Sequence, residues 1–354
     1  MVRPRSLRRR RTRPEPLPAV VYRWDLDKTY LKSEFDRIRE LVRIPFEKAE
    51  DKVAAPGVTA LIRALRETAL AHGREVRTYF VSASPPQIGR AIKKKLELDG
   101  VVYEGIVFKN QLQRLIRGKF RHLREQVGFK LTELLKLHHA DPAGGQEYLF
   151  GDDWESDPLI YSLYADVIAG RVDAAQLADV LRAIRVDSSL IQEACALAEG
   201  GPHADSVSRI FITLERRTPL ANFRCYGSRL VPTFNYLQTA ACLYEEGVLD
   251  RGGVVRVAQS LVEASHYTPE RLANSLADVQ RRGFISEHTV RSIGEELERE
   301  QLFPADRRSS LGRWRAFAAW WQSFWTRIQR SEPVPEPEMP ATIDYLTLVA
   351  RRES

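Results

Sequence analysis

Short apolar runs alternate with amphipathic stretches along the first half of this chain. The runs at residues 19–24, 76–81 and 147–150 have the length and residue types of buried strands. The stretches 58–71 and 86–98 instead place apolar side chains three and four positions apart, as a helix with one buried face does. Strands that alternate with helices predict a parallel sheet with helices on both faces.

Weaker signals extend this α/β pattern to about residue 172. Residues 101–108 and 166–170 have the character of short strands. A helix is expected over residues 129–138, opening directly after Gly128, and another is expected after Pro158.

Beyond residue 173 the pattern changes to helices alone. Glycine and proline separate the amphipathic segments, and none of them has the spacing of a catalytic site. The sequence therefore predicts a helical accessory domain, open to protein or membrane contact. Its expected helices cover residues 174–185, 188–198, 204–216, 232–245, 253–264, 269–281 and 286–300.

A length of 354 residues exceeds that of most single domains, so several regions are expected. Their predicted boundaries are a disordered basic tail at 1–18, an α/β domain at 19–172, the helical accessory domain at 173–303, and an aromatic helix with a proline- and glutamate-rich tail at 304–354.

The excess positive charge belongs to the N-terminal tail. The formal net charge is +7, and residues 1–13 alone hold seven arginines and no acid, so the remainder is near neutral. Such a run is usually solvated, but it can also bind an anionic membrane or a nucleic acid. The sequence has neither the apolar segment of a secretory signal nor a run of about 18 apolar residues. With three scattered cysteines, the sequence fits a cytoplasmic protein.

Acidic and hydroxyl side chains follow the three main predicted strands. Because the carboxyl ends of parallel strands share one edge of a sheet, these side chains can converge on one pocket. They are Asp25 and Asp27 after the first strand, Ser82 and Ser84 after the second, and Asp152, Asp153 and Asp157 after the third.

The pair Asp25 and Asp27 carries the most specific chemical signal. Residues two apart in a strand leave it on the same face, so the two carboxylates lie side by side. Neighbouring carboxylates repel each other and favour a divalent cation or a shared proton. One of them can attack phosphorus while the other handles the proton of the leaving group.

The order of these motifs resembles the haloacid dehalogenase superfamily of phosphatases. More narrowly, residues 81–85 and 151–161 resemble the catalytic domain of the actin-patch-associated phosphatidate phosphatases and their bacterial relatives. The resemblance covers roughly residues 18–172. It implies a Rossmann-like parallel sheet and a phosphatase that requires magnesium.

The resemblance also implies a role for each polar side chain. Asp25 would be the nucleophile that forms an aspartyl-phosphate, and Asp27 the general acid and later the base. Ser82 would donate a hydrogen bond to the phosphoryl group, and Lys130 would offset its charge. Thr29 and Ser84 would contact the substrate. The expected Mg²⁺ ligands are Asp25, Asp27 and Asp152, with Asp153 in reserve.

Several of these roles have alternatives in the sequence. Ser82 could serve only as a helix cap, in which case Ser84 takes its role. Lys109 and Lys119 are alternatives to Lys130 as the cation of the site.

Asp157 also has two interpretations. It either orients the residues that bind the metal or acts only as the N-cap of the helix that Pro158 begins.

A stripe of aromatic side chains recurs at helical spacing near the C-terminus, beside several arginines. Aromatic rings next to arginine suit the interface of a membrane. A terminal helix that packs its aromatic face on the protein is the alternative. The stripe consists of Trp314, Phe317, Trp320, Trp321, Phe324 and Trp325.

These features predict a cytoplasmic, magnesium-dependent phosphomonoester hydrolase that is peripheral to a membrane if the tail and the stripe bind lipid. The expected substrate is phosphatidate or another bulky phosphomonoester. A phosphatase for nucleotides or nucleic-acid ends is the first alternative, with the arginine tail holding the polyanion. A non-catalytic interaction protein built on the same scaffold is the second.

Overall fold

A computed structural model describes most of the chain between residues 18 and 353. The arginine tail, Asp27, Ser84 and the aromatic stripe lie outside the described residues, and so do the predictions made for them. The described ranges are 18–26, 29–30, 54–83, 86–109, 119–141, 145–154, 156–265, 267–303 and 342–353.

The described residues contain one sheet of six parallel strands, in the order β3-β2-β1-β4-β5-β6. The predicted α/β class with a parallel sheet is confirmed. The strands are β1 (Ala19–Asp25), β2 (Val76–Ser82), β3 (Gly105–Phe108), β4 (Gly145–Asp152), β5 (Val207–Thr213) and β6 (Leu230–Thr233).

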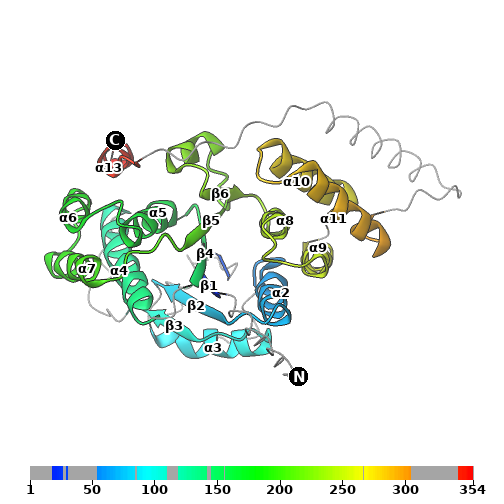
Figure 1. Cartoon of the computed structure of the whole chain (residues 1–354), viewed down its shortest axis with the longest axis horizontal. Helices are drawn as coiled ribbons and strands as arrows, with labels where there is room; N and C mark the ends of the chain where they lie inside the picture. The colour runs from blue at the N-terminus through cyan, green and yellow to red at the C-terminus, as the bar shows by residue number, and fades with distance from the viewer. Residues whose placement is uncertain are drawn as a thin grey trace, which may run out of the picture.

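Alternate strand residues face two separate cores, as the two-residue period of a strand requires. In β1, Val20, Tyr22 and Trp24 belong to the core that α2 and α8–α11 cover. In β4, Leu149 belongs to the other core, beneath α4–α7. Figure 1 shows α4–α7 on one side of the sheet and α2, α8 and α9 on the other.

The helices of the first face are α2 (Val58–Ala71), α3 (Gly89–Leu98), α8 (Tyr236–Glu245), α9 (Arg251–Ser265), α10 (Pro269–Arg281) and α11 (Glu287–Arg299). Those of the second face are α4 (Lys119–His139), α5 (Asp157–Ile168), α6 (Ala174–Ala183), α7 (Ser188–Gly200) and α13 (Tyr345–Glu353). Two 3₁₀ segments, η2 (Pro86–Ile88) and η3 (Leu220–Tyr226), follow β2 and β5.

The prediction that residues 173–303 are helical throughout is wrong. The segment predicted as helix 204–216 contains β5, and β6 precedes α8 where helix 232–245 was expected. In β5, Ile210 and Ile212 enter one core and Phe211 the other. An apolar run buried on both faces has no polar alternation, so periodicity alone does not separate it from a helix.

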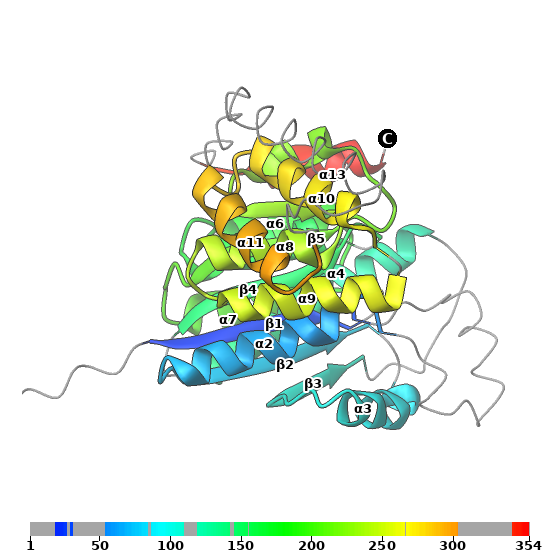
Figure 2. The ribbon, with the colours of Figure 1, turned by 90° about the vertical axis from the view of Figure 1, so that its right-hand side faces the viewer.

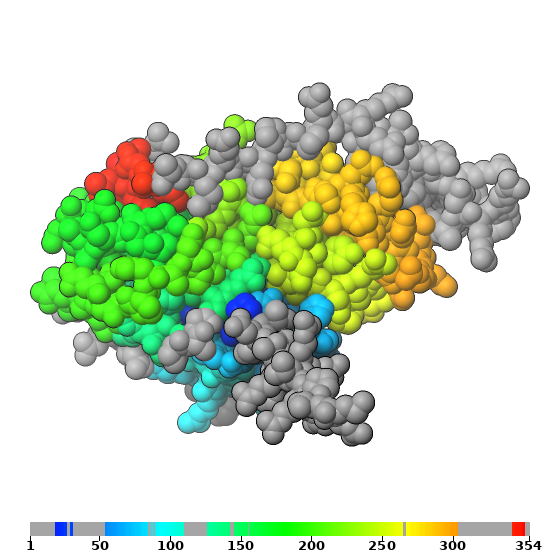
Figure 3. Space-filling view, in the orientation of Figure 1, coloured from blue at the N-terminus to red at the C-terminus, as the bar shows by residue number. Residues whose placement is uncertain are grey.

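The second half of the chain therefore completes the sheet instead of forming a separate all-helical unit. Its helices also pack on the first half, since a Cβ atom on Gly57 would lie 3.4 Å from Val257 and one on Gly253 3.1 Å from Ala64. Figure 2 shows α2 and α9 side by side, and in Figure 3 the yellow and orange segments continue the green surface.

Two smaller predictions are also wrong. Residues 166–168 end α5 instead of forming a strand. Helix α4 begins at Lys119 and not after Gly128, because Gly128 lies inside the helix where a neighbour approaches closely. A Cβ atom there would lie 2.5 Å from Val186 and 3.1 Å from Leu190.

No helix among the described residues combines the length and the apolar character needed to cross a membrane.

Candidate active site

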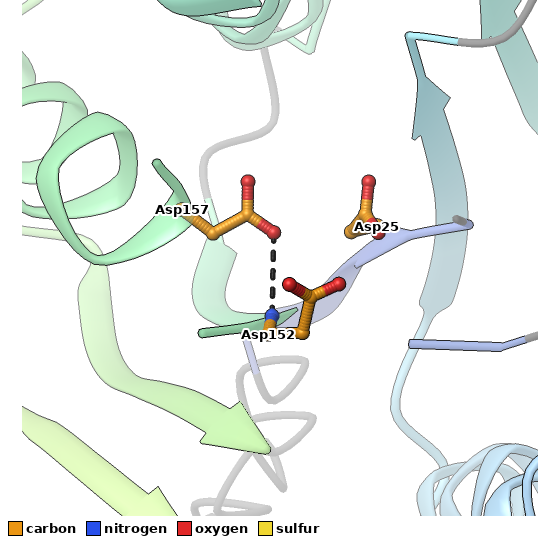
Figure 4. A group of neighbouring side chains, drawn as sticks. All are labelled: Asp25, Asp152 and Asp157. Atoms are coloured by element: carbon orange, nitrogen blue, oxygen red, sulfur yellow. Dashed lines mark hydrogen bonds between the residues drawn. The ribbon is translucent and has the colours of Figure 1, made fainter. Parts of the chain in front are cut away.

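Three carboxylates meet at the carboxyl edge of the sheet. Asp25 ends β1, Asp152 ends the neighbouring β4, and Asp157 is the first residue of α5. One oxygen of each lies within 4.8 Å of the others, and all three side chains are buried (Figure 4). Three buried carboxylates this close require compensating positive charge.

Lys130 supplies part of that charge from the middle of α4. Its Nζ lies 2.7 Å from Asp25 Oδ1 and 2.7 Å from Asp157 Oδ1, and its side chain is only 1% exposed. The predicted lysine thus lies at the carboxylates. Of its alternatives, Lys109 follows β3, which β2 separates from β1. The side chain of Lys119 lies outside the described residues.

Asp157 links Lys130 to the backbone of Asp152 and is not the N-cap of its helix. The residue at the N-cap of α5 is Ser156, and Asp157 Oδ2 accepts a hydrogen bond from the backbone N–H of Asp152 at 3.3 Å. A Cβ atom on Gly151 would lie 2.5 Å from this same oxygen, so glycine permits the close approach. Asp157 therefore holds both Lys130 and the Asp152 backbone.

Asp152 and Asp153 have different surroundings, as consecutive residues of an extended chain should. Asp152 belongs to the carboxylate cluster, and its Oδ1 accepts the N–H of Trp154 at 2.6 Å. The two oxygens of Asp153 accept the backbone N–H groups of Arg216 and Thr218, at 2.8 and 3.0 Å. This geometry places Asp152, and not Asp153, in the cluster that could hold a metal ion. Asp153 instead binds the backbone of the loop after β5.

The two described hydroxyl residues predicted for the site, Thr29 and Ser82, lie in different positions relative to the carboxylates. Thr29 Oγ1 lies 3.5 Å from Asp152 Oδ2, so Thr29 contacts a carboxylate of the cluster. Ser82 is buried at the end of β2, beside β1, where Val81 pairs with Asp25.

Tyr236, which sequence reasoning missed, binds the backbone at Thr29, shortly after β1. Its hydroxyl donates a 2.6 Å hydrogen bond to the backbone carbonyl of Thr29. Its ring lies 6.5 Å from that of Trp24, which stacks on Phe150 at 3.8 Å. Asn235, the N-cap of α8, marks where the helix begins, but no local signal reveals a contact with Thr29.

A buried ion pair, also missed, lies beneath the carboxylates on the same face of β1. Arg23 Nε lies 2.6 Å from Glu147 Oε2, which also accepts the hydroxyl of Tyr164 at 2.8 Å. His138 Nδ1 lies 3.1 Å from the other oxygen of Glu147. Burial raises the pKa of Glu147, but Arg23 and His138 more than offset this and lower that pKa to about 2. A charged residue inside an apolar strand was the available sequence signal.

These four residues come from β1, β4, α4 and α5, the same elements that carry Asp25, Asp152, Lys130 and Asp157. The ion-pair network thus fixes the elements of the site relative to one another.

The donor set fits a hard divalent cation. All three clustered side chains offer carboxylate oxygens, the ligands that Mg²⁺ prefers, and their ligand atoms can surround one ion. A nitrogen or sulfur donor, which would favour a softer metal, is not part of this cluster.

Comparison with known proteins agrees with this geometry. Residues 24–178 match the family model described as phosphatidate phosphatase APP1, catalytic domain. The match contains Asp25, Ser82, Lys130 and the carboxylates at 152–157, and it ends before β5. No curated protein matches the chain. Residues 24–178 are therefore similar to the phosphatidate phosphatase APP1 catalytic domain, whose family is haloacid dehalogenase-like.

Proposed function

We propose that this protein hydrolyses phosphomonoesters through an aspartyl-phosphate on Asp25. The observation that carries the proposal is the cluster of Asp25, Asp152 and Asp157 around Lys130 at the carboxyl edge of the sheet. The family match supports a phosphatase. A buried lysine among carboxylates also suits a site that receives a phosphate dianion.

The proposed reaction has two displacements at phosphorus. A carboxylate oxygen of Asp25 forms a bond to phosphorus while the bond to the leaving oxygen breaks, and Asp27 gives that oxygen a proton. Asp27 then takes a proton from water, whose oxygen attacks phosphorus and releases Asp25 and inorganic phosphate. Ser82 would donate a hydrogen bond to the phosphoryl oxygens, and Lys130 would offset their charge.

Mg²⁺ is the proposed cofactor. Its ligands would be carboxylate oxygens of Asp25 and Asp152 and the backbone carbonyl of Asp27, with Asp157 positioning Asp152 and Lys130. A bound magnesium ion would reduce the negative charge that opposes attack by a carboxylate.

The proposed substrate is phosphatidate or another bulky phosphomonoester, and the match to a phosphatidate phosphatase domain supports the lipid. The arginine tail and the aromatic stripe would then hold a cytoplasmic protein at the membrane surface. Nucleotides and nucleic-acid ends remain substrates for the test to exclude.

The test is phosphate release from a panel of substrates, with Mg²⁺ and with a chelator. The panel comprises phosphatidate in mixed micelles, soluble aryl phosphate, nucleotides and phosphorylated oligonucleotides. Asp25→Asn serves as the inactive variant and Asp179→Asn, at an exposed surface residue, as the matched control. Magnesium-dependent release that Asp25→Asn abolishes supports the proposal, and highest turnover on phosphatidate supports the lipid substrate. Equal phosphate release by Asp25→Asn and by the wild type would exclude the proposed hydrolysis through Asp25.

A further inference from the structure

Three neighbouring strands end side by side next to the carboxylates. Asp152 of β4 pairs with Thr213 of β5, and Thr213 pairs with Thr233 of β6. The residues just beyond these ends therefore form one continuous edge. Large exposed side chains follow all three strands, and we name this set the rim: Trp154, Arg216, Arg217 and Phe234.

The rim exposes two aromatic rings beside cations. Trp154 is 46% exposed and Phe234 is 44% exposed, although large aromatic side chains are usually buried. The guanidinium of Arg216 lies 4.6 Å from the centre of the Trp154 ring, and that of Arg282 lies 5.8 Å from the ring of Phe234. Rings combined with arginine suit the interface between water and lipid head groups.

The loop that carries the arginines is held in an unfavourable backbone conformation. Arg217 has a φ of 56°, in the left-handed region that a branched or long side chain seldom adopts. On either side of it, the N–H groups of Arg216 and Thr218 bind the carboxylate of Asp153. Strain that neighbouring bonds hold in place is typical of functional loops. Asp153 thereby joins the arginine loop to the strand end that carries Asp152.

We propose that the rim binds an anionic phospholipid surface and so brings a lipid phosphomonoester to Asp25. This inference rests on the proposed phosphatase function. The two arginines complement anionic head groups, and the exposed Glu215 reduces the charge of residues 215–217 only to +1. The two rings would lie at head-group depth.

A single-stranded nucleic acid fits the rim less well. Its bases bind by stacking on open aromatic faces. Arg216 already covers one face of Trp154, which leaves that face unable to receive a base. The lipid surface needs no open ring face.

Binding of the full-length protein to vesicles tests the proposal without turnover. The vesicles contain phosphatidylcholine alone or with phosphatidylserine, neither of which is a phosphomonoester. Arg217→Asn removes the charge with a residue that tolerates positive φ. The matched control is Arg185→Asn, since Arg185 is also exposed, has a φ of 62° and lies in the turn between α6 and α7.

We expect Arg217→Asn to weaken binding to the phosphatidylserine vesicles about fivefold, as the loss of one arginine charge at an anionic surface should. Phe234→Ala should weaken it as well, whereas Arg185→Asn and Leu98→Ala, the latter at a 54% exposed residue of α3, should not. Hydrolysis of a soluble aryl phosphate by Arg217→Asn should match that of the wild type.

Equal vesicle binding by Arg217→Asn and Arg185→Asn would overturn the proposal. A further set of vesicles contains phosphatidate in place of phosphatidylserine. Binding to these vesicles alone would also overturn the proposal, because the active site alone would then recognise the membrane. Loss of oligonucleotide binding without loss of vesicle binding would assign the rim to nucleic acid instead. If the rim variants weaken vesicle binding but the protein hydrolyses no phosphomonoester, the rim is supported as a lipid-binding surface and the proposed phosphatase function is wrong.

Discussion

The hydroxyl of Tyr236 donates a hydrogen bond to the backbone carbonyl of Thr29, which lies 207 positions earlier in the sequence. This bond connects the start of α8, outside the family match, to the loop that follows Asp25. Tyr236 is buried, so if its hydroxyl were removed, water would not readily replace it as the donor to the Thr29 carbonyl. The second half of the chain is thus part of the frame that positions the site.

Replacing Tyr236 with phenylalanine should therefore lower kcat. One unpaired buried carbonyl costs about 1–3 kcal/mol, and a misplaced loop of this kind would reduce kcat by roughly tenfold or more. Tyr244→Phe is the matched control, because the hydroxyl of Tyr244 in α8 is also hydrogen-bonded, at 2.8 Å to Ser292 of α11, away from the carboxylates. Steady-state kinetics and thermal unfolding of both variants provide the comparison. Equal loss of stability with an equal, small change in kcat would reduce Tyr236 to a packing residue.

Lys130→Met should abolish most turnover. The change removes the cation between Asp25 and Asp157 while keeping most of the side-chain volume, so a reduction in kcat of about 10²–10³ is expected. Lys136→Met, six residues along α4 at a partly exposed ion pair, is the control and should keep near-normal kcat. A Lys130→Met enzyme as active as this control would show that the lysine is only structural.

Substitutions at the two consecutive aspartates should have different effects. Asp152→Asn should raise the Mg²⁺ concentration needed for half-maximal activity, because it removes a carboxylate from the cluster. Asp153→Asn should leave that concentration almost unchanged and mainly loosen the loop at Arg216–Thr218. Magnesium titrations of activity measure both. A larger shift for Asp153→Asn would reverse the assignment of the metal ligand.

Glu147 should make stability depend on pH in the acid range. Its pKa in the folded protein is about 2, below the ordinary value of 4.5, so its contribution is complete above pH 4.5 and is lost as pH falls towards 2. At neutral pH, Glu147→Gln leaves Arg23 buried without its partner and should cost roughly 3–5 kcal/mol of unfolding free energy.

Urea unfolding at several pH values checks this prediction, with Glu97→Gln as the control at an exposed ion pair. The difference between wild type and Glu147→Gln should shrink as pH falls below 4.5. A difference that stays constant down to pH 2 would mean that the charge of Glu147 contributes nothing.

Local patterns predicted the elements that have clear ends or one buried face. Helix α2 and helix α10 begin and end where their apolar spacing does, and β1 lies where the first apolar run predicts it. The common location of the polar residues at the strand ends was also predictable, because the carboxyl ends of parallel strands lie at one edge of the sheet.

The missed features depend on contacts between distant segments. The sequence pattern predicts a helix where β5 lies because Ile210, Phe211 and Ile212 are all buried, which removes the alternation that marks a strand. The sequence pattern predicts a helix start at Gly128 because the sequence does not show that Val186 approaches this glycine closely. The contacts of Tyr236 and Asp153 likewise join segments that only the folded sheet brings together.

Acid-quenched mass spectrometry of the protein during turnover tests the role of Asp25 most directly. Rapid mixing with a soluble aryl phosphate and Mg²⁺, followed by acid and proteolysis, should yield a peptide containing Asp25 with one added phosphoryl group. The phosphoryl group should be lost on treatment with hydroxylamine and be absent in Asp25→Asn. An active enzyme that never carries a phosphoryl group on Asp25, or carries it on another residue, would show that Asp25 is not the nucleophile.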